Sequence, residues 1–303
     1  MQFDQTMFPF RVLEIVGNAI ETQNKDSAIE TINAAAHYFE KRRIAQGKKK
    51  SAYIEMLQNL VSVLNTGFPS YSVFSINGNS KLPFVAFSAL PGKAHCPGAG
   101  DCLLWCYSFK SWMRTRAFGR QAQNSILRKY YPQRIVEALD AVMAKPKFKH
   151  GLTLRLYVDG DFNNLSDFAL WQGVLIERPS IAAYGYSKSF DIILAYADSG
   201  ATFAPNYVLN VSSGHRHDES TVQRIKALPI TRGAFVAVPV SRKGRSIDHG
   251  NAEHRKAVQS VLRASDGVTK AFACPGLCGS CTSIGHACGS MKFKGISIGI
   301  AVH

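Results

Sequence analysis

Seven cysteines are the residues of this sequence best suited to chemistry, because all of them fall in two short segments. The first segment, HCPGAGDCLLWC, contains Cys96, Cys102 and Cys106. The second, CPGLCGSCTSIGHAC, contains Cys274, Cys278, Cys281 and Cys288. An odd number of clustered thiols, in a chain that we expect in a reducing compartment, favours metal ligation; a disulfide framework is the alternative.

The second segment predicts a metal site. Four thiolates on a glycine-rich loop can close a tetrahedral zinc site or hold an iron–sulfur cluster. Zinc sites usually contain two CxxC pairs, whereas here only Cys278 and Cys281 form one, so the spacing leaves the metal open. His286 is an alternative ligand in the same loop.

The first segment has three thiols where a closed site takes four. Three thiolates can leave one iron of a 4Fe-4S cluster without a protein ligand, and that iron can bind a substrate or cofactor. In one alternative, His95 or a distant residue completes a structural site; in another, both segments form one larger site. Three plus four uses all seven cysteines, which favours two separate sites.

The elements that must position these thiols follow two patterns. Residues 8–66 show apolar positions at helical spacing, with Asp26 or Ser27 placed to cap the second helix and Gly67 to end the third. We therefore predict an N-terminal helical domain over residues 1–70 and a cysteine-rich β/α domain over 71–303. A further long helix is expected from Leu103 to Tyr131, and another from Pro132 to Met143.

From residue 150 onward, short β-branched and aromatic runs alternate with helix-like segments. Such alternation implies parallel strands joined by right-handed crossovers. The fold class predicted is α/β: a six-unit parallel β/α partial barrel, or an open sheet, with cysteine-rich metal-binding loops. The predicted strands lie within Lys81–Gly92, Leu152–Gly160, Ile181–Ser189, Asn206–Gly214, Gly233–Ser241 and Val268–Gly276.

Polar residues end most of these strands, where such folds place their working groups. We expect one site lined by all of the strand ends. Asp159 and Asp161 could alternatively bind a divalent metal in a nuclease, and DGD after a strand is also ordinary turn sequence. The candidates beside the cysteines are Asp159, Gly160, Asp161, Ser187, Lys188, Asn210 and Ser212.

Composition suggests the partner. The 303-residue chain has a formal net charge of +15, which favours a polyanion such as nucleic acid; a solvated basic surface is the alternative. The start MQFDQTMFPF lacks a basic leader and no stretch reaches membrane-spanning length, so we expect a cytoplasmic protein that does not enter membranes. Basic runs lie at 41–43, 48–50, 114–120 and 241–245, and nearby aromatic residues that could stack on bases are Trp112, Phe118, Tyr130 and Tyr131.

Several blocks, in this order, resemble the phage and plasmid "gene product 88-like" family. They are GNSKLPFVAFSALPGKAHCPGAGDCLLWCYSF, LRLYVDGDF, AAYGYSKS, NYVLNVSSG, GAFVAVPVS, CPGLCGSCTS and GIAVH. The resemblance covers Asn77 to His303, and His303 matches the histidine that closes the family's pattern. The resemblance implies that the protein comes from a mobile genetic element, and it says less about which reaction the protein carries out.

A looser resemblance is to radical S-adenosylmethionine enzymes with an auxiliary cluster. These are similar in having a three-cysteine loop after the first strand, an aromatic residue before the third cysteine, here Trp105, and an acidic glycine-containing motif after the second strand. The resemblance implies that Asp159, Gly160 and Asp161 hold the cofactor's amino group. This sequence departs in its thiol spacing, five and three residues instead of three and two.

Two functions follow from the sequence. In the first, the cluster at Cys96, Cys102 and Cys106 cleaves S-adenosylmethionine, the second cluster relays electrons or binds substrate, and the substrate is a nucleic acid or related to a nucleotide. Ser187, Lys188, Asn210 and Ser212 then line the pocket. In the second, the protein is a non-catalytic nucleic-acid-binding factor whose loops are held by iron–sulfur clusters or zinc.

Overall fold

The computed structural model describes residues 8–41, 47–77, 82–240, 252–266, 271–278, 281–282 and 286–302. Its centre is an eight-stranded sheet with the strand order β1-β2-β3-β4-β5-β6-β8-β7. All neighbouring strands pair in parallel except β1 and β2. The strands are β1 (Phe74–Ser75), β2 (Val85–Phe87), β3 (Leu152–Leu156), β4 (Ile181–Ser187), β5 (Tyr207–Ser212), β6 (Thr231–Pro239), β7 (Ala271–Ala273) and β8 (Ser297–Val302).

This architecture confirms the α/β prediction and settles its alternative in favour of an open sheet. From β2 to β6 the strands lie side by side in chain order, as expected for successive right-handed crossovers. The prediction missed β1 and β8. The first has only two residues, and β8 lies between β6 and β7, so chain order does not reveal its neighbours.

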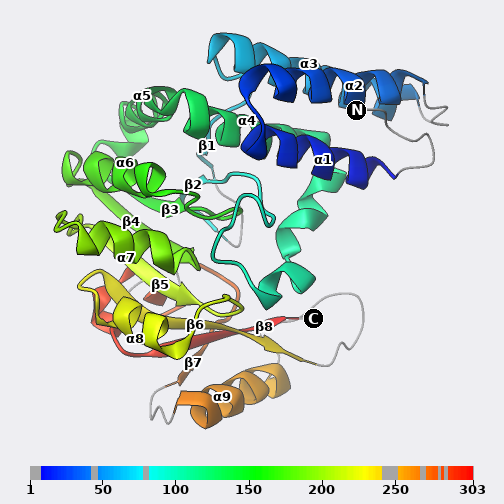
Figure 1. Ribbon diagram of the computed structural model, residues 1–303. Helices are drawn as coiled ribbons and strands as arrows, with labels where there is room; N and C mark the ends of the chain where they lie inside the picture. The colour runs from blue at the N-terminus through cyan, green and yellow to red at the C-terminus, as the bar shows by residue number, and fades with distance from the viewer. Residues whose placement is uncertain are drawn as a thin grey trace.

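The two faces of the sheet carry different side chains because successive residues of a strand point to opposite sides. One face packs its alternate apolar residues, such as Leu154 and Leu209, into the main core. Figure 1 shows α6, α7 and α8 along one side of the sheet. The other face, here called the thiol-loop face, bears Tyr184 and Val208, which pack with Cys288 and its neighbours.

The helices begin with a group of three at the top of Figure 1. Asn24, rather than the predicted Asp26 or Ser27, caps the second helix, because its side chain accepts a 2.9 Å hydrogen bond from the Ser27 amide. Gly67, with φ of 73°, follows the end of the third, as predicted. The domain boundary at residues 70 and 71 stays a prediction. The group consists of α1 (Pro9–Thr22), α2 (Lys25–Lys41) and α3 (Gly47–Thr66).

The helix expected to start at Leu103 starts twelve residues later, at Thr115. Two 3-10 turns, Asp101–Trp105 and Tyr107–Met113, precede it. The Cys102 amide donates to the Gly214 carbonyl at 3.2 Å, so the loop after β5 holds this stretch of backbone. The remaining helices are α4 (Thr115–Tyr130), α5 (Pro132–Met143), α6 (Leu165–Ile176), α7 (Phe190–Asp198), α8 (Glu219–Ala227) and α9 (Ala252–Asp266).

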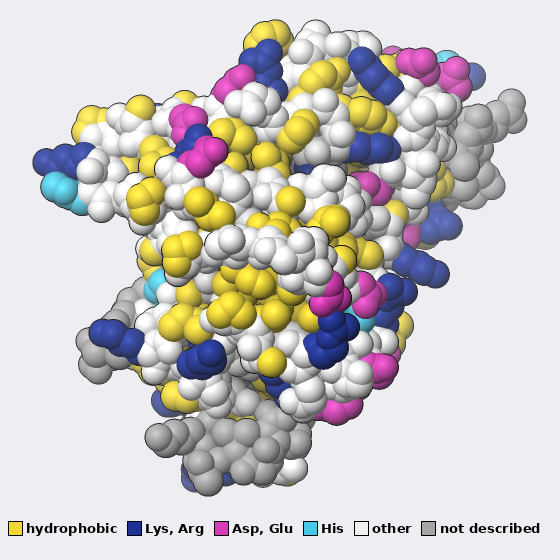
Figure 2. Space-filling view, turned by 60° about the vertical axis from the view of Figure 1, so that its left-hand side comes forward, with side chains coloured by type: hydrophobic (Ala, Val, Ile, Leu, Met, Phe, Trp, Pro, Cys, Tyr) yellow, Lys and Arg dark blue, Asp and Glu magenta, His cyan; other side chains and the backbone are white. Residues whose placement is uncertain are grey.

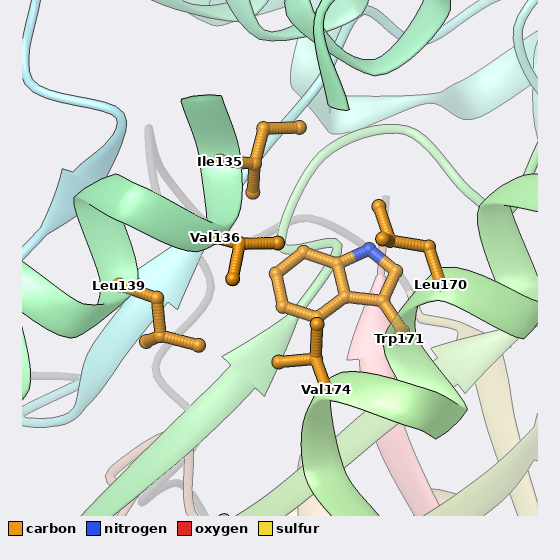
Figure 3. Close-up of a pocket in the computed structure, with 6 residues that line it drawn as sticks. All are labelled: Ile135, Val136, Leu139, Leu170, Trp171 and Val174. Carbon is orange, nitrogen blue, oxygen red and sulfur yellow. The ribbon is translucent and has the colours of Figure 1, made fainter. Parts of the chain in front are cut away.

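Trp171 shows how the helical layer closes over the sheet. Its indole, 1% exposed, lies between α5 and α6 with apolar side chains of both helices around it (Figure 3). The gap between these side chains has no room for a water molecule. The ring also meets Phe87 of β2 edge to face, with centroids 5.2 Å apart. Trp171 is therefore a core residue.

Candidate functional site: two thiol groups on one sheet

The first cysteine segment, between β2 and α4, is fastened to the loop that follows β5. Ala99 and His215 form an isolated β-bridge, and the Gly98 carbonyl accepts a 3.1 Å hydrogen bond from the Arg216 amide. Gly98 lies against the end of β4 so closely that an added Cβ atom would be 1.6 Å from the Lys188 carbonyl oxygen. The glycine thus allows the thiol loop to approach the carboxyl ends of the strands.

Asp161 organises those strand ends. Its Oδ1 accepts hydrogen bonds from the Phe162 amide at 2.8 Å and the Ser187 hydroxyl at 2.7 Å, and its Oδ2 accepts one from the Lys188 amide at 2.7 Å. Burial raises the pKa of this carboxyl, and the hydrogen bonds and the Lys188 charge oppose that rise. The Lys188 ammonium donates to the Ser212 hydroxyl at 2.9 Å, which joins the ends of β4 and β5.

The three thiols share this neighbourhood. Burial raises the pKa of Cys96, and the charges of Asp161 and Cys106 raise it further. Burial also raises the pKa of Cys102, where the Lys188 charge opposes it. The structure thus brings the first thiol group, Cys96, Cys102 and Cys106, together with Asp161 and Lys188.

Other predicted residues have different surroundings. Asp159 is half-buried; its carbonyl accepts a 3.0 Å hydrogen bond from the Ala89 amide, and its charge acts on Arg120 and Tyr107. Gly160 has φ of 79°, and a Cβ atom there would lie 3.0 Å from the Leu90 carbonyl oxygen. Both residues therefore form the turn that packs on the chain leaving β2, and their predicted roles stay predictions.

His95, the alternative fourth ligand, is turned toward the N-terminal helices. Its Nε2 lies 3.0 Å from the Gly17 carbonyl oxygen, and its Nδ1 lies 3.2 Å from a Glu21 carboxylate oxygen. The same carboxylate oxygen accepts a 3.0 Å hydrogen bond from Arg128. In this arrangement both ring nitrogens of His95 face groups of α1, so the ring anchors the thiol loop to that helix.

The second thiol group consists of Cys274, Cys278, Cys281 and Cys288 and belongs to the thiol-loop face. The Gly276 amide donates to the Cys274 sulfur at 3.4 Å, and the Ala287 amide donates to the Cys281 sulfur at 3.3 Å. Burial raises the pKa of Cys274 to about 12, and the other three thiols add to this effect. Burial likewise raises the pKa of Cys288 to about 11, against the Tyr186 hydrogen bond and the Arg232 charge.

Asn210 belongs with this second group. Its amide nitrogen donates to the Cys288 carbonyl at 2.9 Å and to the Gly185 carbonyl at 3.0 Å. Its amide oxygen accepts from Arg232 at 2.6 Å. Asn210 therefore holds the second thiol loop on the sheet, and its predicted cofactor role stays a prediction.

The donor set suits a sulfur-ligated metal centre. Backbone amides that donate to cysteine sulfur are a usual feature around iron–sulfur clusters. The thiols of each group interact with thiols of the same group, and those of the first group interact also with Asp161 and Lys188. In the described part of the chain, however, no three His, Cys, Asp or Glu side chains are already arranged to hold one metal ion. The thiols are gathered in two groups, and because metals bind the thiolate form, metal binding releases thiol protons.

Several residues of this region were not recognised from the sequence. Arg155 of β3 and Tyr184 and Tyr186 of β4 lie on the thiol-loop face, where the Arg155 guanidinium is 4.8 Å from the Tyr186 ring centroid. Their signal was present, since Arg155 alternates with the leucines of one predicted strand and Tyr184 and Tyr186 alternate with small residues in the next. These residues lie within strands, whereas most of the predicted site residues lie at or after strand ends.

The basic runs have a mixed placement. Much of 41–43, all of 241–245 and the side chains of 48–50 lie outside the described residues. On the side of the molecule seen in Figure 2, Lys and Arg are interspersed with Asp and Glu. Trp112 and Phe118 are 2% and 0% exposed, so the suggestion that they stack on bases is wrong for the folded chain.

Together, the mostly parallel sheet and its two thiol groups define an α/β protein with cysteine-rich loops. The chain belongs to the family described as Gene product 88, which matches residues 45–293. This confirms the predicted family, and the match starts at residue 45, upstream of both α3 and Asn77. His303 lies outside both the match and the described residues.

No curated protein and no solved structure matched the chain. The similarity to radical S-adenosylmethionine enzymes therefore has no support from relatives and stays a prediction. Among the described residues, no helix combines the length and the apolar character needed to cross a bilayer.

Proposed function

We propose that this protein is an iron–sulfur protein of a phage or plasmid with two separate clusters. The first thiol group would hold a cluster with one open iron, and the second thiol group would hold a fully ligated one. The observation that carries the proposal is the division of the thiols: three lie beside Asp161 and Lys188, and four lie on the thiol-loop face. Zinc in either group is the alternative metal.

The open cluster supports a radical S-adenosylmethionine-like activity on a nucleic acid or a nucleotide-related substrate. When bound, such a cluster supplies one electron to a sulfonium ligand at its open iron. Lys188 would then face the carboxylate or phosphate of a bound molecule, with Ser212 fixing its ammonium. Asp161 holds the Lys188 backbone and Ser187 in place and so acts as a positioning residue.

Metal analysis tests the two-cluster proposal. We expect protein purified without oxygen to be brown and to contain about eight irons with matching sulfide, the sum of two 4Fe-4S clusters. Replacing Cys96, Cys102 and Cys106 by serine should remove about four irons and leave the rest, and replacing the other four cysteines should do the reverse. Each variant is the control for the other. A colourless protein containing zinc would exclude the redox function.

Cleavage of S-adenosylmethionine tests the activity. Under a strong reductant we expect 5′-deoxyadenosine from the intact protein and none from the triple variant of the first group. The Asp161→Asn variant should keep its iron and lose most of this product. The asparagine side-chain nitrogen cannot accept the hydrogen bond that the Lys188 amide donates to Asp161. If the protein contains iron but yields no 5′-deoxyadenosine, the cluster proposal is retained and this activity is rejected.

The second candidate function is non-catalytic binding of nucleic acid by a metal-stabilised scaffold. The observation favouring it is the net charge of +15. Its test is the salt dependence of oligonucleotide binding.

A further inference from the structure

Three buried polar atoms on the thiol-loop face have no hydrogen-bond partner: Arg155 Nε, Tyr184 Oη and His286 Nε2. Buried polar groups are normally satisfied, so each unsatisfied one calls for an explanation. These three lie together. Arg155 and Tyr184 are paired residues of β3 and β4, and the Tyr184 and His286 rings are 4.7 Å apart.

Arg155 also lacks a counter-charge. A guanidinium is permanently protonated and has five N–H donors, yet no carboxylate of the described residues pairs with this one. Its neighbours are the Tyr186 ring, the hydroxyls of Tyr107 and Tyr184, and the Cys278 thiol. Tyr107 directly follows Cys106 in the chain, so Arg155 lies between the two thiol groups.

The Tyr184 hydroxyl completes the donor set. It lies against the Cys278 thiol, but no hydrogen bond of regular geometry satisfies its buried oxygen. Arginine and a tyrosine hydroxyl converging from two strands match the oxygens of a carboxylate or phosphate, which guanidinium groups bind in a bidentate manner. The Tyr186 ring, 4.8 Å from the guanidinium, helps to orient this planar group.

We propose that Arg155 and Tyr184, with His286 beside them, form a binding subsite for the carboxylate or phosphate group of a small molecule held between the two thiol groups. That this molecule is the substrate rests on the proposed function. The anion site itself rests on the unpaired guanidinium and the unsatisfied donors around it.

The test uses the full chain as purified without oxygen, titrated with inorganic phosphate and, separately, with acetate. Binding is followed by calorimetry and by the shift in melting temperature. We expect saturable binding with at least a tenfold weaker affinity in Arg155→Gln and an intermediate one in Arg155→Lys. Arg178→Gln is the matched control, since Arg178 already pairs with Asp140 at 2.7 Å and 3.0 Å and should leave binding unchanged. The anion that binds more tightly identifies phosphate or carboxylate as the natural group.

Tyr184→Phe keeps the test decisive if the Arg155 variants fold poorly by circular dichroism, since it removes one hydroxyl and should weaken binding several-fold. Equal affinity in wild type, Arg155→Gln and Tyr184→Phe, or no saturable binding of either anion to wild type, overturns the proposal. So does an Arg155→Gln variant that shifts only the reduction potential of a bound cluster, because Arg155 would then be the charge partner of Cys278.

Iron content separates this proposal from the proposed function. Anion binding that depends on Arg155 in a protein without iron supports the subsite and rejects the clusters. If the protein contains iron and its affinity for the anion is the same in wild type and Arg155→Gln, the clusters are supported and the subsite is rejected.

Discussion

Gly98 is the residue at which the thiol loop comes nearest to the sheet. Because a Cβ atom would lie 1.6 Å from the Lys188 carbonyl oxygen, Gly98→Ala must push the loop away from the strand end. Overpacking of this kind costs about 1–3 kcal/mol. We expect the free energy of unfolding, measured by denaturant titration, to fall by about that amount.

Gly173→Ala is the control for this change. Gly173 lies inside α6, and a Cβ atom added there would have nothing within 4 Å. Alanine is favoured over glycine in helices by roughly 0.8–1 kcal/mol, so this variant should be more stable than wild type. If Gly98→Ala were as stable as Gly173→Ala, the close approach of loop and strand would be wrong.

At this scale, the sequence identifies residues whose type alone is informative. The thiols and Asp161, Ser187, Lys188 and Ser212 were recognised because cysteines cluster and polar residues end buried strands. Arg155 was not recognised, because its importance depends on which face of β3 it occupies and on what covers that face. His95 looked like a ligand beside Cys96, but its partners on α1 lie about eighty residues away in sequence, as the Gly17 contact shows.

Among the elements, α1 is joined to the sheet region by a buried ion pair. Glu21 of α1 accepts a 3.0 Å hydrogen bond from Arg128 of α4 and lies 3.2 Å from His95 of the thiol loop. Burial alone would raise the pKa of Glu21, but the His95 and Arg128 interactions outweigh it and hold the pKa below its ordinary value. The ionised carboxylate therefore stabilises the folded chain.

Glu21→Gln should lower the free energy of unfolding by about 1–3 kcal/mol at pH 7, because Arg128 loses a buried partner. A lowered carboxyl pKa contributes stability above the ordinary value near 4.5, and that contribution is lost as pH falls through the lowered value. The difference between wild type and variant should accordingly shrink below pH 4.5. Denaturant titrations from pH 7 down to about pH 2 check this.

Glu14→Gln on the same helix is the matched control, since Glu14 pairs with Arg11 at the surface. Exposed pairs contribute little, so this variant should match wild type across the same range. A pH-independent difference for Glu21→Gln would mean that the carboxylate acts through packing and not through its charge.

Elements with a strong local pattern were predicted, and those fixed by distant contacts were not. The strands β3 to β6 and the helices α6 and α8 carry their own periodicity, whereas the segment of α7 has no clear pattern. The turns at Asp101–Trp105 and Tyr107–Met113 have a helix-like sequence, but the Gly214 carbonyl takes the Cys102 amide. The position of β8 between β6 and β7 is likewise a tertiary feature.

For the whole molecule, the net charge of +15 predicts attraction to polyanions. We expect affinity for a single-stranded oligonucleotide to fall as salt rises, with a slope of log K against log salt of about −0.7 for each phosphate neutralised. Arg114 and Arg116 are exposed next to the thiol loop, so a patch there should carry part of the binding. Fluorescence anisotropy at several salt concentrations measures both quantities.

Charge reversal distinguishes a patch from diffuse charge. Arg114→Glu with Arg116→Glu, and Lys145→Glu with Lys149→Glu, change the net charge equally, and all four residues are exposed. If nucleic acid binds beside the first thiol group, the arginine pair should weaken binding at least tenfold and flatten the salt slope, while the lysine pair should have a small effect. Equal losses would mean that the charge acts only as a long-range field. In that case the metal-stabilised binding scaffold loses its specific site, and the cluster chemistry is left as the function that the thiol groups support.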